Sequence, residues 1–375
     1  MKTTLILIIS LLAFTVQATV RTVSNNPASI AQFNTIQAAI DASADSDTVY
    51  VYGSPNTYDA FTILDKRITV IGPGRAPVKN LPLQALINGA SLRDSPAGGS
   101  PNGSELHGLV FINTVTLSRN QVGGDLPVNN VRVIRCQFNS TVNWQLSSSG
   151  HLFEGNYFLF QLNFTGTSTY ENFLFQNNTF FFNVSSLGSS TQINGLTNSV
   201  NVRFDHNLFY SNNNSGGSTI AVFGSNCRFL DFSNNIFNQA NAGLNVSFST
   251  FTNNLTNNVT LNSANEVSNA TPWLVSSNVD GGGNISNQNP QLASQTAVDA
   301  GTVSNALDLT VTAGPAIDAG SDGKDLGLLF DATGSLNWAN SRNARLPRIF
   351  SMNITTPTVS PGGNISVTID ARKSN

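Results

Sequence analysis

A short pattern of apolar and polar positions recurs six times between residues 131 and 256. An apolar residue stands three positions before a pivot, the pivot is Asn in five of the six copies, and Phe follows two positions later in five of six. The pivots, spaced by 20, 22, 29, 28 and 19 residues, are Cys136, Asn156, Asn178, Asn207, Asn235 and Asn254. A repeat of this length predicts stacked structural repeats rather than one compact core.

Each copy predicts a short strand, a tight bend at the pivot and a second short strand. We expect the pivot to adopt the left-handed backbone conformation, which Asn tolerates. Stacked Asn side chains can hydrogen-bond from coil to coil, and stacked Phe rings can fill a narrow interior. The fold that satisfies this pattern is an all-β parallel β-helix. The expected ladder and core residues are Asn156, Asn178, Asn207, Asn235, Asn254, Phe153, Phe175, Phe204 and Phe232.

The pattern divides the chain into five segments. Residues 1–18 have the features of a cleaved signal peptide, with Lys2 before an apolar run and a small-residue cleavage site at Ala18. Residues 19–80 are expected to hold an amphipathic helix over 33–42, closing the open end, and the first strand over 47–52. The repeats occupy 81–262, and irregular coils follow over 263–335. The segment 336–375 alternates as strands do and is either a β-rich cap or the start of a truncated domain.

Composition narrows the class of protein. Charged residues make up only 10% of the chain and the net charge is −3, so no basic footprint for nucleic acid is present. The signal peptide and the lack of another long apolar run predict a protein that is secreted, on the cell surface or periplasmic, without a membrane span after cleavage. The two cysteines, Cys136 and Cys227, are expected about 19 Å apart, too far for a disulfide. We interpret both as buried fillers, with a reactive thiol as the alternative.

Three parts of the chain resemble the pectin-lyase-like family of secreted bacterial β-helix proteins. Residues 33–40, 47–51 and 68–74 are similar to the family's N-terminal cap and first coils. The repeats look like its Asn-ladder coils, and residues 314–320 with 325–327 look like the end of many bacterial members. The resemblance covers about residues 30 to 330. It implies a single-stranded right-handed parallel β-helix with a short N-terminal capping helix. It does not imply one activity, because the family includes lyases, hydrolases, epimerases and non-catalytic proteins.

The motifs of two enzyme branches can be compared with this chain. Residues 201–206 resemble the Val-Trp-Ile-Asp-His segment of pectate lyases, with Arg203 at the Trp position. The Arg-x-Pro-x-x-Arg pattern of the lyases has no match in the repeats, and the Gly-His-Gly and paired-Asp motifs of polygalacturonases are absent. Catalytic residues therefore cannot be assigned by resemblance, and a lyase acting by β-elimination is the activity expected if there is one.

One charged patch is expected on the outside of the repeats. When the outward positions are counted from each pivot, they predict that Arg203 stacks on Asp231. They also predict that Asp205 and His206 lie between the polar residues of the neighbouring coils. Arg228 joins them if it leads into the next coil. Three interpretations stay open: an ion pair between coils, a glycan-binding groove, or catalysis in which His206 or Arg203 takes a proton. Asp205 and Asp231 are weak candidates for holding calcium.

A second candidate for calcium is the acidic loop with Asp318, Asp322 and Asp325, although Asp in such turns often only caps the backbone. The sequence as a whole predicts a monomeric, non-catalytic surface or extracellular protein that binds glycans or neighbouring surfaces, with no cofactor. The alternative is a polysaccharide lyase or glycoside hydrolase acting on acidic polysaccharide, with calcium as a cofactor if it is a lyase.

Overall fold

The structure is a computed structural model of the chain. It describes residues 18–75, 83–121, 123–182, 191–212, 222–224, 226–238, 246–257, 270–304, 307–329, 348–354 and 367–372. Residues 1–17, on which the expected signal peptide falls, lie outside this set. No helix within the described ranges is long and apolar enough to cross a membrane.

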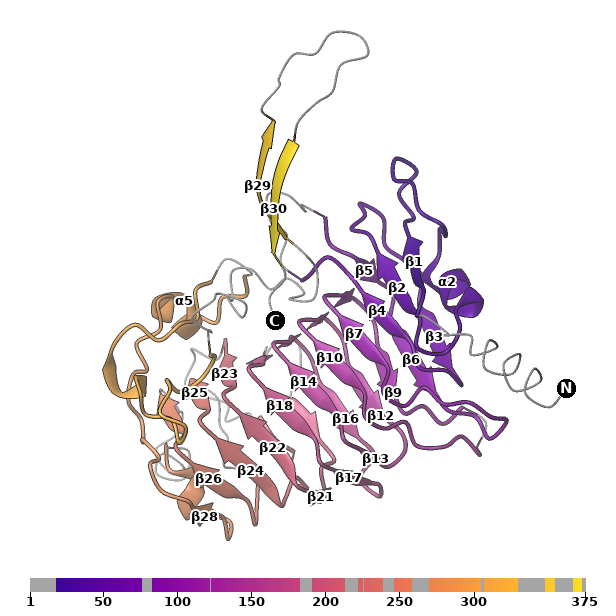
Figure 1. Cartoon of the computed structure of the whole chain (residues 1–375). Helices are drawn as coiled ribbons and strands as arrows, with labels where there is room; N and C mark the ends of the chain where they lie inside the picture. Colours follow the sequence, from indigo (N-terminus) through magenta and orange to yellow (C-terminus); the bar gives the residue numbers. More distant parts are fainter. Residues whose placement is uncertain are drawn as a thin grey trace, which may run out of the picture.

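Most of the described strands form four parallel sheets (Figure 1). The first sheet consists, in spatial order, of β1 (Val20–Val23), β2 (Thr48–Val51), β4 (Thr69–Ile71), β7 (Glu105–His107), β10 (Arg132–Ile134), β14 (Leu152–Glu154), β18 (Leu174–Gln176), β22 (Val202–Asp205), β24 (Leu230–Ser233), β26 (Thr250–Thr252) and β28 (Val279–Asp280). The second consists of β5 (Leu86–Ile87), β8 (Val110–Phe111), β11 (Gln137–Phe138), β15 (Tyr157–Phe158), β19 (Thr179–Phe182), β23 (Leu208–Ser211), β25 (Ile236–Asn238) and β27 (Leu255–Asn257).

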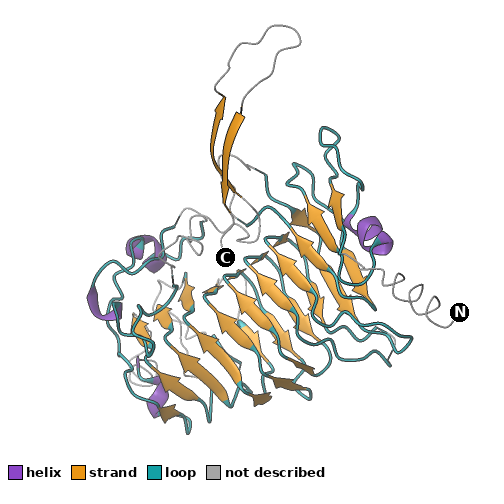
Figure 2. Ribbon diagram, viewed as in Figure 1, coloured by secondary structure: helices purple, strands orange, loops and turns teal. Residues whose placement is uncertain are grey.

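The remaining parallel strands form two smaller sheets. The third sheet consists of β3 (Phe61–Leu64), β6 (Ala90–Arg93), β9 (Val115–Leu117), β12 (Val142–Trp144), β16 (Leu162–Phe164) and β20 (Ile193–Asn194). The fourth consists of β13 (Ser148–Ser149), β17 (Thr169–Glu171) and β21 (Asn198–Val200). Successive turns of the chain visit these sheets in the same order and pair in parallel with the turn before (Figure 2). The described chain is therefore all-β and mostly parallel, and its stacked coils are compatible with a parallel β-helix.

Buried asparagines join consecutive coils between the first and second sheets. The Nδ2 atom of Asn156 donates to Oδ1 of Asn178 at 3.0 Å, and the same bond repeats along the series. Each backbone N–H of the series also donates to the next Oδ1, so the buried amides are paired. The ladder continues to Asn284, which the repeat pattern did not predict.

Two columns of stacked Phe rings fill the interior beside the ladder. Phe153, Phe175, Phe204, Phe232 and Phe251 form one column, with ring centroids 4.6 to 5.3 Å apart. Phe111, Phe138, Phe158, Phe180, Phe209 and Phe237 form the other, with centroids 4.6 to 5.3 Å apart. All of these rings are buried. Burying each Phe contributes about 2–3 kcal/mol, so the two columns stabilise the repeats.

The expectation that the pivot takes the left-handed conformation is wrong. The left-handed residue is the one before the pivot, as at His206 (φ 52°), Asn234 (φ 60°) and Arg135 (φ 54°). The reason is the ladder itself, because the pivot side chain must point inward to reach the Asn of the next coil. The bend is therefore made one residue earlier, where the side chain faces outward.

The N-terminal end differs from the expectation in one respect. The strand predicted over 47–52 is present as β2, but it is not the first strand. β1 precedes the helix α2 (Ile36–Ala42) and pairs in parallel with β2 at the edge of the first sheet. The side chain of Thr35 caps α2 by accepting from the N–H of Ala38, and α2 packs against β1, β2 and β3 (Figure 1). Only the short segment Val-Arg-Thr-Val encodes β1, too little for a periodic signal.

The segment after the repeats returns along the outside of the second sheet. We call residues 292–304 and 307–329 the C-terminal strap. The strap contains α5 (Gln295–Asp299) and a 3-10 turn, η2 (Gly314–Ala316). Another 3-10 turn, η1 (Pro272–Leu274), lies before the strap and precedes β28. Apolar strap residues pack on outward side chains of the second sheet, forming a second buried cluster. Its members include Leu292, Val298, Leu309, Leu326, Tyr157, Leu208, Tyr210, Ile236 and Leu255.

The two remaining strands, β29 (Arg348–Ile354) and β30 (Val367–Arg372), pair with each other antiparallel. Both strands fall in the tail that the sequence predicts to be β-rich. Cys136 and Cys227 are both buried and free. Burial raises the pKa of Cys136 to about 12 and that of Cys227 to about 11, which disfavours the reactive thiolate.

Candidate functional site

The strands β22, β24 and β26 place the predicted charged residues side by side. Arg203 lies opposite Asp231 and Asp205 lies opposite Ser233, as the repeat spacing predicts. Asp231 in turn lies opposite Thr250. Side chains alternate across a strand, so Phe204 points into the core while Arg203 and Asp205 point outward.

Asp205 is the centre of a hydrogen-bond network. Its Oδ1 accepts from Ser233 Oγ at 3.0 Å and from Asn234 Nδ2 at 2.9 Å, and it lies 3.0 Å from Nδ1 of His206. Burial alone would raise the pKa of Asp205, but hydrogen bonds from His206, Asn234 and Ser233 outweigh burial and lower it. Asp205 is therefore ionised and held in one orientation across two coils.

His206 does not lie on the open surface, contrary to the expectation for the patch. Its side chain is only 2% exposed, and its Nε2 lies 3.6 Å from Oδ1 of Asp322 in the C-terminal strap. The strap is anchored there because the N–H of Ser321 donates to Oδ1 of Asn234 at 2.7 Å. The sequence prediction failed because the strap, far away in sequence, covers this bend. His206 is thus held between Asp205 and Asp322, although it is among the residues that line the site.

Arg228 lies outside the strands that carry the other charged residues. It comes before the bend at Phe229 (φ 59°), and its N–H donates to the carbonyl of Leu196. Arg228 is not among the residues that line the depression described below, and the chain bends between it and Asp231. The structure therefore brings together Arg203, Asp205, Asp231 and, beneath the surface, His206.

A depression of about 450 Å³ lies over these residues. Its charged lining consists of Arg203, Asp205, Asp231 and Asp322. His206 also lines it, and Ser233, Asn234, Thr250, Thr252 and Ser321 supply neutral polar groups. Three carboxylates against one guanidinium give the lining an excess of acidic groups. Partial burial raises the pKa of Asp231, and the Arg203 guanidinium offsets only part of that effect. The depression is thus acidic and rich in hydrogen-bonding groups.

The acidic loop of the strap supplies Asp322 to this site, which the sequence did not predict. Oδ2 of Asp322 also lies 3.1 Å from Nζ of Lys324. Asp325 accepts from the backbone N–H of Asp318 at 2.9 Å, which is the backbone-capping role considered for this loop. Within the described ranges, no three His, Cys, Asp or Glu side chains are grouped so that they could hold a metal ion.

A second polar cluster lies under the strap and was also missed. The Arg75 guanidinium lies 5.2 Å from the ring centroid of Tyr157, whose hydroxyl contacts that of Tyr210. Tyr210 donates to the carbonyl of Thr302 in the strap. Burial lowers the pKa of Arg75 to about 10 and raises that of Tyr157 to about 12. These groups are buried, so they fix the strap rather than face a ligand.

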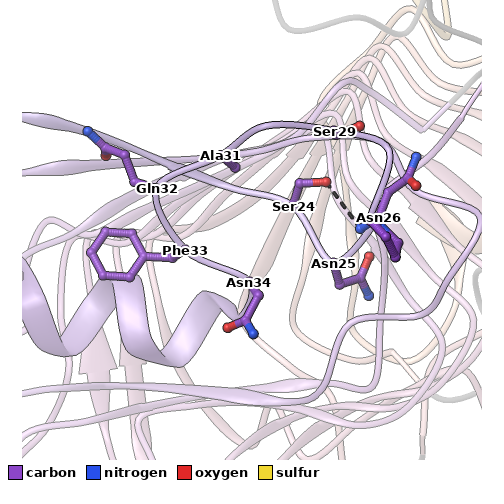
Figure 3. A pocket seen from close by; sticks show the side chains of 9 residues that line it. Ser24, Asn25, Asn26, Ser29, Ala31, Gln32, Phe33 and Asn34 are labelled. Atoms are coloured by element: carbon purple, nitrogen blue, oxygen red, sulfur yellow. Dashed lines mark hydrogen bonds between the residues drawn. The ribbon is translucent and has the colours of Figure 1, made fainter.

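Another depression, of about 580 Å³, lies at the N-terminal end (Figure 3). Figure 3 shows Ser24, Asn25, Asn26, Gln32 and Asn34 around it, and the Ser24 side chain accepts from the N–H of Asn26. No titratable side chain lines it. It offers neutral hydrogen bonds but no acid, base or strong charge, so the acidic depression is the better candidate.

Comparisons with known proteins do not extend this picture. A scan against protein-family models gives no match to the chain, and a search of curated proteins gives none either.

Proposed function

We propose that this protein is a secreted, non-catalytic parallel β-helix protein that binds glycans in the acidic depression. The proposal includes the finer features implied by the resemblance: a right-handed coil of the pectin-lyase-like kind, with α2 as its N-terminal cap. The packing of α2 on the first coils supports the capping role. Secretion rests on the sequence of residues 1–18, and a periplasmic or cell-surface location follows from the same segment.

The lining of the depression favours a neutral, hydroxyl-rich glycan. Carboxylates accept hydrogen bonds from hydroxyl groups, and Arg203, Ser233 and the two threonines can donate to ring or hydroxyl oxygens. An acidic polysaccharide would instead bring its carboxylates against a lining with more carboxylates than cations, and like charges oppose binding. The single observation that carries this choice is the excess of carboxylates in the depression.

The burial of His206 supports binding over β-elimination. A lyase needs a base within hydrogen-bond reach of the proton beside the sugar carboxylate. His206 is held between two carboxylates beneath the surface. Arg203 is exposed, but a guanidinium keeps its proton at all ordinary pH values. His206 and Arg203 are thus poorly suited to supply the base of a lyase, and the carboxylates of the depression can accept hydrogen bonds from a glycan.

A binding panel tests the proposal. Isothermal titration of the purified protein with neutral and acidic oligosaccharides should give binding to a neutral member and none to the acidic ones. Asp231→Ala should abolish it, because Asp231 is exposed in the depression. The matched control is Asp59→Ala, which removes an exposed carboxylate elsewhere in the chain and should leave binding unchanged. Release of unsaturated ends absorbing in the ultraviolet, or of new reducing ends, would instead identify a lyase or a hydrolase. Binding of no glycan would refute the proposal.

A further inference from the structure

Two exposed aromatic rings lie next to each other on consecutive coils. Phe229 is 52% exposed and Phe248 is 53% exposed, and their ring centroids are 5.7 Å apart with an interplanar angle of 28°. The coils are joined directly at this point, because the N–H of Phe229 donates to the carbonyl of Ser247. The two rings therefore form a small stacked surface open to solvent.

The backbone at both residues has an unfavourable conformation. Phe229 has φ of 59° and Phe248 has φ of 51°. Two earlier coils place Asn172 (φ 56°) and Asn201 (φ 52°) at the corresponding bend, before β18 and β22. Asn tolerates this left-handed region, whereas a bulky side chain there is a true outlier.

Burial does not compensate for this strain, because about half of each ring remains in water. A residue that breaks a local rule without a structural gain points to a function that needs it. Two aromatic rings exposed together at such bends indicate a surface that contacts a ligand.

The rings lie beside the acidic depression. Phe229 comes two residues before Asp231 on β24, and Phe248 comes two residues before Thr250 on β26. Asp231 and Thr250 both line the depression. Cα atoms two residues apart lie at most about 7 Å from each other, so the aromatic surface and the depression are close enough for one extended ligand.

We propose that Phe229 and Phe248 form a stacking platform for a pyranose ring of the neutral glycan whose next residue is bound in the acidic depression. The face of an aromatic ring carries partial negative charge, and the C–H face of a pyranose is apolar with slightly positive hydrogens. The hydroxyls at the edge of the sugar then remain free to bond with Asp231 and Arg203. This inference rests on the proposed function and adds an aromatic subsite to it.

A second copy of the chain is a weaker candidate for this surface. Half of two Phe side chains amounts to roughly 200 Å², since one aromatic side chain buries about 150–250 Å². A stable protein interface buries about 1,000 Å² or more. The two rings alone are thus too small for a protein partner, but they match the face of a sugar.

The double variant Phe229→Asn/Phe248→Asn tests the platform. Asn suits the left-handed bend, so the variant should melt at the same temperature as the wild type or higher. Its affinity for the neutral hexasaccharide that binds best in a panel of cello-, xylo- and mannohexaose should fall about tenfold or more, as loss of aromatic stacking predicts. Phe229→Trp/Phe248→Trp should retain the affinity. Ile30→Asn, which removes an apolar side chain that is 98% exposed elsewhere, is the control and should bind normally.

Each other outcome overturns the platform. If the Asn variant binds the hexasaccharide as tightly as the wild type, the rings take no part in recognition; if it also melts earlier, their role is structural. If sedimentation shows wild-type dimers that the Asn variant abolishes, the surface holds a second copy. If Asp231→Ala abolishes binding while the Asn variant does not, the depression binds glycan and only the platform fails. A wild type that binds no hexasaccharide in the panel removes both proposals.

Discussion

Asn207 donates from its Nδ2 to Oδ1 of Asn235, 2.9 Å away, and also to the carbonyl of Phe175. In the other direction, Oδ1 of Asn207 accepts from both the backbone N–H and the Nδ2 of Asn178. All of these groups are buried. One side chain thus satisfies donors and acceptors in three successive coils, which explains why the repeat tolerates loops of variable length but keeps the pivot.

Replacing Asn207 by Ala should lower the free energy of unfolding by about 1–3 kcal/mol, because two buried donors of Asn178 lose their acceptor. Urea unfolding followed by circular dichroism measures the change. Asn143→Ala, at a partly exposed position on the third sheet, is the control and should change stability by about 0.5 kcal/mol or less. Equal stability of Asn207→Ala and the wild type would mean that the ladder contributes no net free energy.

The sequence allowed the repeat to be predicted because both of its signals are local. The columns at Phe204 and Asn207 recur at fixed offsets, and those offsets determine the register of Arg203 on Asp231. The sequence pattern missed Asn284 because the Phe columns stop before it. Its distance from its ladder partner, Asn254, is 30 residues, which is close to the longest spacings between the predicted pivots.

The strap could not be predicted in the same way. Its hydrogen bonds to the coils join positions 57 to 152 residues apart, as between Asn238 and Gln295 or between Asn177 and Leu329. One signal was available: outward positions after the pivot become apolar at Tyr157, Leu208 and Ile236. A solvent-exposed sheet face would be polar there, so this column already indicates a cover. The burial of His206 follows from that cover and was missed with it.

His151 should make stability depend on pH. Its Nδ1 accepts from the N–H of Val131, and burial lowers the pKa of its side chain from 6.5 to about 3. The unfolded chain takes up a proton near pH 6.5 and the folded chain does not. The contribution of a neutral His151 is thus complete above pH 6.5 and is lost as pH falls from 6.5 towards 3, by at most about 1.4 kcal/mol per pH unit.

The measurement is urea unfolding at a series of pH values between 7 and 4, with His151→Phe for comparison. Phe cannot take up a proton, so the variant should lose stability less steeply over this range, even if it is less stable at pH 7 because Val131 loses its acceptor. Parallel pH profiles for the two proteins would show that His151 is protonated in the folded state.

Asp322 should shield His206 from solvent. The His206 side chain is 2% exposed and lies against Asp322, which is 35% exposed itself. Asp322→Ala should therefore open a path to the ring. Diethyl pyrocarbonate should then modify His206 faster in this variant than in the wild type, as measured by mass spectrometry. Lys324→Ala is the control, because Lys324 pairs with Asp322 without touching His206. His107 and His151 are buried elsewhere and should react slowly in all three proteins. Unchanged reactivity of His206 would show that other parts of the strap enclose it.

Gly327 tests how tightly the strap is fitted to the second sheet. It has φ of +78°, and a Cβ atom added there would lie 2.7 Å from Cδ1 of Ile236. Gly323 has φ of +75° with nothing within 4 Å of such an atom. Both Gly→Ala variants should lose about 1–2 kcal/mol of stability, because Ala disfavours the left-handed backbone conformation. Only the added methyl group of Gly327→Ala also meets a packed neighbour.

Limited proteolysis should therefore cut the strap faster in Gly327→Ala than in Gly323→Ala. In Gly327→Ala, the depression should also lose the Asp322 side of its lining. Equal cleavage rates in the two variants would mean that the strap shifts freely on the sheet, and Asp322 would then no longer belong to a fixed site.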